Sequence, residues 1–176
     1  MSGQGGRYQR SAGGLVGAMA VLLVVLVAWM SLRALTSNDP ASPVREVDYA
    51  QDVPAVQKAA DFDVLAPPSL PDGWRATTVS FDDQRPQHWH LGVLTDCDRY
   101  VGLEQGGRSV RSMVEEYVDP AATRSGPVDV SGQRWASYTD SGGDLALVRR
   151  EGATTTLVVG NGLPRAELVS FTVSLR

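Results

Sequence analysis

The sequence predicts an α+β protein, in which a single N-terminal transmembrane helix precedes one antiparallel-sheet domain with helices packed on one face. Two observations carry this prediction. Residues 12–30 form an uninterrupted apolar run. Beyond residue 74, segments rich in β-branched and aromatic side chains alternate with tight turns, in the order strands, helix, strands, helix. This order lacks the regular βαβ alternation of a parallel sheet, so we expect antiparallel strands.

The apolar run has the length and composition of a membrane anchor. Its 19 residues, 12–30, contain no charged side chain, and as a helix they span about 28 Å, close to the roughly 30 Å of a hydrocarbon core. Arg7 and Arg10 precede the run and Arg33 follows it, which favours a cytoplasmic N-terminus. The alternative is a cleavable signal peptide, but the run is longer than the about 7–15 apolar residues of such a segment, and no clean cleavage site follows it.

These features divide the chain into four parts. We expect a cytoplasmic tail at residues 1–11, a transmembrane anchor at 12–32, a linker at 33–52 and an extracytoplasmic domain at 53–176. Within the anchor, Gly13 and Gly17 have a small-x-x-x-small spacing that lets two helices approach closely. They are the candidate residues for membrane-helix packing, although glycine is also common in transmembrane helices in general.

Composition narrows the choice of partners. From residue 34 onward the chain has 13 basic and 20 acidic side chains. A domain this acidic lacks the positive surface that binds nucleic acid, and it is not attracted to an anionic lipid surface. We therefore expect no nucleic-acid partner; the expected partners are the lipid bilayer, through the anchor, and an envelope protein or a small ligand. Cys97 is the only cysteine, which excludes an intramolecular disulfide.

The predicted domain begins with a short helix and a proline-rich segment. Pro54 suits the first turn of a helix over residues 53–61, because a proline there removes no helical hydrogen bond. The prolines of residues 66–74 favour an extended chain. Within this segment, residues 70–73 have the residue order of a type I turn, which delivers Trp74 into the domain.

Three strands and one helix follow. The patterns predict strands at residues 76–81, 89–94 and 100–104, with a hairpin connection at residues 95–98 between the last two. Ser109 is a candidate cap for a helix that ends before Pro120. The apolar stripe of this helix has the spacing i, i+3, i+4 and i+7 and comprises Val110, Met113, Val114 and Tyr117.

A meander and a final helix complete the prediction. Four strands separated by glycine-containing turns are expected at residues 127–130, 133–139, 144–150 and 154–159. A helix is expected from Pro164 to about Phe171, although residues 171–175 alternate as a strand does. The expected core members of the meander are Trp135, Leu145, Leu147, Leu157 and Val159.

Several motifs, in their order along the chain, resemble those of a known family. They are P-x-x-L-P-x-G-W-R from Pro67, W-x-L-G from Trp89, Y-V-x-L-E-Q from Tyr100, G-x-x-W from Gly132, a Thr- and Val-rich segment that ends at Gly160, and a late E-L at Glu167. Together with the single anchor and the linker, they resemble the bacterial membrane-anchored family called domain of unknown function 4245, found in high-GC Gram-positive bacteria. The resemblance covers nearly the whole chain. It implies the location and the architecture, and it supplies no catalytic residues.

His88 and His90 are the candidate metal ligands. Residues i and i+2 of a strand point to the same face, so the two imidazoles could bind zinc or copper there. Asp82 or Asp83 could supply a third ligand. Structural sites require four ligands and catalytic sites three, and the sequence offers no convincing set. In the alternative interpretation both histidines lie on the solvent face of a strand, while Trp89 points inward.

Other catalytic patterns are missing from the sequence. It contains no G-x-S-x-G nucleophile elbow. The adjacent acids at residues 82–83 diverge on a strand, and those at residues 115–116 lie about 100° apart on a helix, so neither is placed as a glycosidase pair. Gly106 and Gly107 before a helix suggest an anion site but lack the lysine of a P-loop. We therefore expect no catalytic residue and no cofactor.

The expected function is non-enzymatic. We expect a membrane-anchored extracytoplasmic domain that binds a ligand or a partner in the cell envelope, and a pocket rimmed by Trp or Tyr in the folded domain would favour this hypothesis. One alternative is a metal-dependent or hydrolase-type envelope enzyme that uses His88 and His90. Another is a structural or assembly subunit that acts through its membrane helix.

Overall fold

The computed structural model describes Met19, Leu22, Leu23, Leu26 and residues 45–176. The predicted cytoplasmic tail, nearly all of the predicted anchor with Gly13 and Gly17, and most of the predicted linker lie outside these residues. Within the described part of the chain, no helix is both long and apolar enough to cross a bilayer. Residues 45–176 form one of two units, and the fold below is that of this unit alone.

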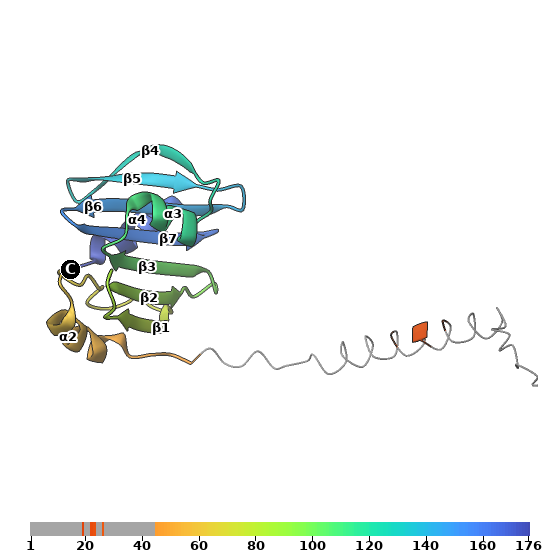
Figure 1. The fold of residues 1–176 in the computed structure, drawn as a ribbon, viewed down its shortest axis with the longest axis horizontal. Coiled ribbons are helices and arrows are strands. Elements are labelled where there is room, and N and C mark those ends of the chain that lie inside the picture. The colour runs from red at the N-terminus through yellow and green to blue at the C-terminus, as the bar shows by residue number, and fades with distance from the viewer. Residues whose placement is uncertain (1–18, 20–21, 24–25, 27–44) are drawn as a thin grey trace, which may run out of the picture. The chain divides into compact units, whose positions relative to one another are not determined.

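The unit is built on seven antiparallel strands. They are β1 (Arg75–Asp82), β2 (His88–Leu94), β3 (Tyr100–Gly106), β4 (Thr123–Val130), β5 (Gln133–Thr139), β6 (Asp144–Glu151) and β7 (Thr154–Asn161). All seven belong to one sheet in the order β1-β2-β3-β7-β6-β5-β4 (Figure 1). The sheet therefore consists of two meanders, β1 to β3 and β4 to β7, which meet where β3 pairs with β7. This confirms the predicted antiparallel α+β architecture.

Most strand bounds agree with the sequence pattern, and β4 is the main exception. It begins at Thr123, four residues before the predicted start at residue 127. The register of β4 against β5 shifts between Ser125 and Val128, so the intervening Pro127 sits at an irregularity. Proline has no backbone N–H to donate. Because β4 is an edge strand and pairs with β5 alone, it tolerates a proline and continues through it.

Three helices accompany the sheet, namely α2 (Tyr49–Ala59), α3 (Val110–Tyr117) and α4 (Arg165–Ser174). Ser109 caps α3 as predicted, because its side-chain oxygen accepts a hydrogen bond of 3.1 Å from the backbone N–H of Ser112. Residues 171–174, which alternate like a strand, are helical, since α4 continues to Ser174 and, of residues 171–175, only Leu175 is extended. At the other end, the backbone N–H of Val47 donates to the carbonyl of Ala76 and α2 begins at Tyr49, which is buried, so residues 45–52 of the predicted linker belong to the folded unit.

The prediction that the helices pack on one face of the sheet is wrong. Leu145 and Leu147 of β6 belong to one apolar layer, whereas Ala146 and Val148, which alternate with them, belong to another. Helix α3 packs on the second layer over β6 and β7, and α4 packs on the first, on the opposite side of the sheet (Figure 1). The physical reason is that β6 is buried on both faces over these four residues, so both faces require a cover.

The two layers differ in extent. The smaller layer lies under α3 and contains Met113, Val114, Ala146, Val148, Leu157 and Val159. The larger layer lies on the opposite face of the sheet, beneath α2 and α4, and its largest fully buried members are Trp89, Leu91, Leu103, Leu147 and Leu168. The face of β1 to β3 opposite the larger layer therefore has no apolar layer of its own. The side chains on this face are candidates for a functional site.

Candidate functional site

The first candidate region is the face of β2 and β3 opposite the larger apolar layer. Trp89 is fully buried in that layer, so strand alternation directs His88 and His90 to the other face. This confirms that the two histidines share a face, as their i, i+2 spacing predicts. Across the hairpin, His90 is paired with Glu104 of β3, and His88 is paired with Gly106.

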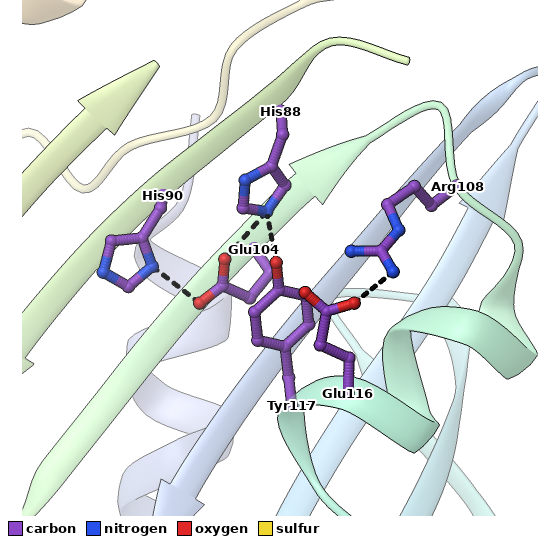
Figure 2. Close-up of polar contacts among 6 residues, drawn as sticks. All are labelled: His88, His90, Glu104, Arg108, Glu116 and Tyr117. Carbon is purple, nitrogen blue, oxygen red and sulfur yellow. Dashed lines mark hydrogen bonds and ion pairs between the residues drawn. The ribbon is translucent and has the colours of Figure 1, made fainter. Parts of the chain in front are cut away.

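The carboxylate of Glu104 lies between the two imidazoles (Figure 2). Its Oε1 is 2.6 Å from Nδ1 of His90, and its Oε2 is 2.9 Å from Nε2 of His88. The Glu104 side chain is only 2 % exposed, and the imidazoles are 20 % and 18 % exposed. A carboxylate this deeply buried requires charged or hydrogen-bonding partners. His90 hydrogen-bonds Oε1, whereas Oε2 lies 2.9 Å from Nε2 of His88 and has no hydrogen-bond partner in the described unit.

Tyr117, from the last turn of α3, closes this arrangement. Its hydroxyl is 3.2 Å from Nε2 of His88, and the two rings stack almost parallel, with centroids 5.6 Å apart and an angle of 8° (Figure 2). Beside it, Arg108 is paired with Glu116, and the Arg108 guanidinium lies 6.0 Å from the centre of the Tyr117 ring. We call His88, His90, Glu104 and Tyr117 the imidazole–carboxylate cluster.

Tyr100 covers the neighbouring part of the same face. A Cβ on Gly102 would lie 3.1 Å from both Cε1 and the hydroxyl of Tyr100, and one on Gly92 would lie 3.3 Å from its Cε2. The tyrosine ring therefore occupies the space that the two glycines leave open. Burial, and next the negative charge of Glu104, raises the pKa of Tyr100 to about 12. The same two causes, in the same order, raise the pKa of Tyr117 to about 12.

The geometry of the cluster limits its chemistry. Glu104 faces Nδ1 of His90, which orients that ring and leaves Nε2 as its second nitrogen. At His88, however, both the carboxylate and the Tyr117 hydroxyl approach the same nitrogen, Nε2. A hydroxyl–imidazole–carboxylate relay requires them at opposite ring nitrogens, so His88 does not form one.

The acid that joins the histidines is not one of the predicted third ligands. Asp82 is paired with His88 across β1 and β2 but is exposed, and Asp83 lies beyond the end of β1. Glu104 faces both imidazoles directly, at hydrogen-bonding distance. Among the residues of the described unit, no three or more His, Cys, Asp or Glu side chains are arranged to hold a metal ion.

The second candidate region is a groove of about 550 Å³ between α4 and the proline-rich segment. Trp74 forms part of its wall and stacks on Phe171 of α4, with ring centroids 5.9 Å apart and an angle of 21°. The residues of α4 that line it have the spacing i, i+3, i+4 and i+7. The full lining, which we call the tryptophan groove, is Ser69, Leu70, Pro71, Trp74, Asp96, Glu167, Ser170, Phe171 and Ser174.

A tight turn holds the tryptophan in the wall. The backbone N–H of Trp74 donates to the carbonyl of Pro71 over 3.0 Å, so the turn spans residues 71–74, one residue later than predicted. Gly73 has φ +79°, which fits the third position of a type II turn rather than the expected type I. A Cβ on Gly73 would lie 2.9 Å from Cβ of Asp96, so the turn packs closely on the β2–β3 loop.

The polar groups of the groove face open space. Asp96 and Glu167 are exposed, and neither forms an ion pair with a side chain of the described unit. Arg75, which follows Trp74 in the sequence, is already paired with Asp98 over 2.5 Å. Sequence periodicity does not predict this groove, because its lining comes from three segments that are far apart along the chain.

Comparison with known proteins identifies a family but no activity. A family model described as "Protein of unknown function (DUF4245)" matches residues 7–174. This confirms the resemblance that the sequence motifs indicate. Comparison with curated proteins and with solved structures gives no match.

Proposed function

We propose that this chain, which belongs to the DUF4245 family of proteins of unknown function, is a single-pass membrane protein whose external domain binds a ligand in the cell envelope without catalysing a reaction. The apolar run at residues 12–30 supports the membrane location, and Arg7 and Arg10 before it support a cytoplasmic N-terminus. The observation that carries the binding function is the tryptophan groove.

The groove has the features of a ligand site. Its volume of about 550 Å³ lies within the roughly 300–1,000 Å³ that is typical of small-molecule pockets. Leu70, Trp74 and Phe171 provide an apolar surface, while hydroxyl and carboxylate groups surround it. The aromatic stack and the tight turn fix these walls before any ligand arrives, so little conformational entropy is lost on binding.

The imidazole–carboxylate cluster supports an enzymatic function less strongly than the tryptophan groove supports a binding function. Its polar atoms face one another, and the hydroxyl of Tyr117 shares a nitrogen of His88 with Glu104. The one observation in favour of catalysis is the contact between Glu104 and Nδ1 of His90, the arrangement of a carboxylate that orients a general base. The second candidate function is therefore a hydrolase-type activity with His90 as the base, oriented by Glu104.

Fluorine NMR tests the binding function on the full chain in lipid nanodiscs. The four tryptophans are replaced with 5-fluorotryptophan, and the variant Trp74→Phe identifies the Trp74 resonance. Titration with benzyl alcohol should shift the Trp74 resonance saturably and leave that of the fully buried Trp89 unchanged. A Trp74 resonance that stays in place up to the solubility limit of the probe would contradict the proposal.

A matched pair of variants separates binding in the groove from partition into the bilayer. Ser170→Leu places a larger side chain in the groove from the exposed side of α4, so it should abolish the shift. Ala166→Leu adds a leucine to the same helix at an exposed position that does not line the groove, so it should preserve the shift. Equal titration curves for the two variants would show that the probe binds elsewhere.

A further inference from the structure

We propose that the tryptophan groove selects a small organic cation, in which an ammonium or guanidinium group is attached to an aromatic or aliphatic body. This inference rests on the proposed binding function and names the chemical class of its ligand. It starts from the charges at the rim. Asp96 approaches from the β2–β3 loop and Glu167 from the first turn of α4, and the residues that line the groove include no basic side chain.

Both carboxylates are free to pair with a ligand. Neither forms an ion pair with a lysine or an arginine of the described unit, and Arg75, which follows Trp74 in the sequence, is held by Asp98. An incoming cation therefore breaks no existing ion pair. An incoming anion would meet two negative charges and no positive side chain among the residues that line the groove, which is unfavourable even at the high dielectric constant of a surface.

The aromatic wall favours the same charge. A cation is attracted to the face of an aromatic ring, and tryptophan gives the strongest attraction of this kind. Trp74 lines the groove and is half-buried, which reduces the screening of the interaction by water. The hydroxyls of Ser69, Ser170 and Ser174 add hydrogen-bond acceptors for the N–H groups of an ammonium or guanidinium ion.

The two acids contribute unequally. Glu167 lies in the first turn of α4, where the positive end of the helix dipole offsets part of its charge. Asp96 lies in a loop and has no such compensation. Removal of the charge of Asp96 should therefore weaken cation binding more than removal of the charge of Glu167.

Three probes of similar shape test the charge preference in the full chain in nanodiscs, with the Trp74 resonance as the readout. Benzylammonium should bind about five- to tenfold more tightly than benzyl alcohol, and benzoate should bind more weakly than either. Asp96→Asn should remove most of the difference between benzylammonium and benzyl alcohol, and Glu167→Gln should remove less of it. Asp52→Asn, an exposed acid of α2 outside the groove, makes the same change in net charge and should leave the difference intact.

The outcomes separate this inference from the proposed function. Equal affinity of the three probes, each with a saturable Trp74 shift, would overturn the charge preference and leave the groove as a binding site. Equal losses in Asp52→Asn and Asp96→Asn would also overturn it, because the preference would then come from the overall charge of the domain. The absence of any Trp74 shift with all three probes would overturn the proposed binding function itself.

Discussion

The imidazole–carboxylate cluster and the tryptophan groove contain similar kinds of side chain, aromatic rings beside carboxylates, but these side chains have different partners. In the cluster, Glu104 is almost fully buried and contacts two imidazoles. In the groove, Asp96 and Glu167 face open space, and the ring of Trp74 is only half-buried. Polar groups that are buried against one another contribute to the stability of the fold, whereas polar groups that face a cavity can bind a ligand. The cluster should therefore affect stability more, and the groove should affect binding more.

The largest expected effect is on stability, in the variant His90→Ala. This change removes a partner of the buried Glu104 carboxylate and should lower the free energy of unfolding by about 3 kcal/mol. Urea unfolding of the full chain in nanodiscs, followed by tryptophan fluorescence, measures the loss. Ser80→Ala, an exposed position paired with His90 on β1, is the control and should change stability by no more than about 0.5 kcal/mol.

A second variant tests whether the charge is responsible. If the uncompensated carboxylate causes the loss, Glu104→Gln should cost less in the His90→Ala background than in the parent chain, because there it removes an unfavourable buried charge. Benzylammonium binding in the groove should stay unchanged in His90→Ala and in Glu104→Gln. If His90→Ala were as stable as Ser80→Ala, the cluster would not support the fold, and the comparison with the groove would be wrong.

The variant Trp74→Ala should show the opposite balance. It removes the stack on Phe171, and because Trp74 is half-buried we expect a stability loss of about 2 kcal/mol, less than for His90→Ala. Binding of benzylammonium, measured by saturation transfer from protein to probe, should disappear. Trp74→Phe keeps an aromatic ring and should retain part of both properties. Unchanged binding in Trp74→Ala would remove the groove from the proposed function.

The two regions also differ in how far the sequence predicts them. Strand periodicity places the two histidines on one face. Their partner Glu104 follows from the predicted hairpin. If Leu94 and Tyr100 are paired on either side of the predicted loop, antiparallel register pairs His90 with Glu104, as observed. Local pattern and short-range register therefore place three of the four members of the cluster, whereas Tyr117 reaches it through the packing of α3 on the sheet.

The tryptophan groove depends on tertiary packing. Its walls join the turn at residues 71–74, the β2–β3 loop and α4, and no periodic pattern relates these segments. The incorrect prediction of helices on one face has a related cause. The run Leu145–Val148 is apolar without alternation, which indicates burial on both faces, but the helices that cover each face are determined only by the three-dimensional packing.

Alkaline titration should distinguish the tyrosines around the cluster from ordinary ones. The pKa values of Tyr100 and Tyr117 are raised from 10.0 to about 12, so the fold favours their neutral forms. Their contribution to stability is fully present below pH 10 and is lost as the pH rises through about 12. Absorbance at the phenolate band should show two tyrosines that ionise near pH 12, and Tyr100→Phe and Tyr117→Phe should each remove one. Ionisation of either near pH 10 would show that water screens its hydroxyl from the charge of Glu104.

The smallest expected effect is that of Glu116→Gln, at the border of the cluster. The hydrogen bond from Arg108 lowers the pKa of Glu116 below 4.5, so this pair stabilises the fold above pH 4.5 and the stabilisation is lost as the pH falls below that value.

Glu116 is exposed, and the loss at neutral pH should therefore be below about 1 kcal/mol. Its charge also raises the pKa of Tyr117, so Glu116→Gln should lower that pKa, whereas Glu115→Gln, which breaks the exposed pair with Arg111, should not. If the pKa of Tyr117 were the same in the two variants, the charge of Glu116 would have no effect on Tyr117, and Glu116 would not contribute to the electrostatics of the cluster.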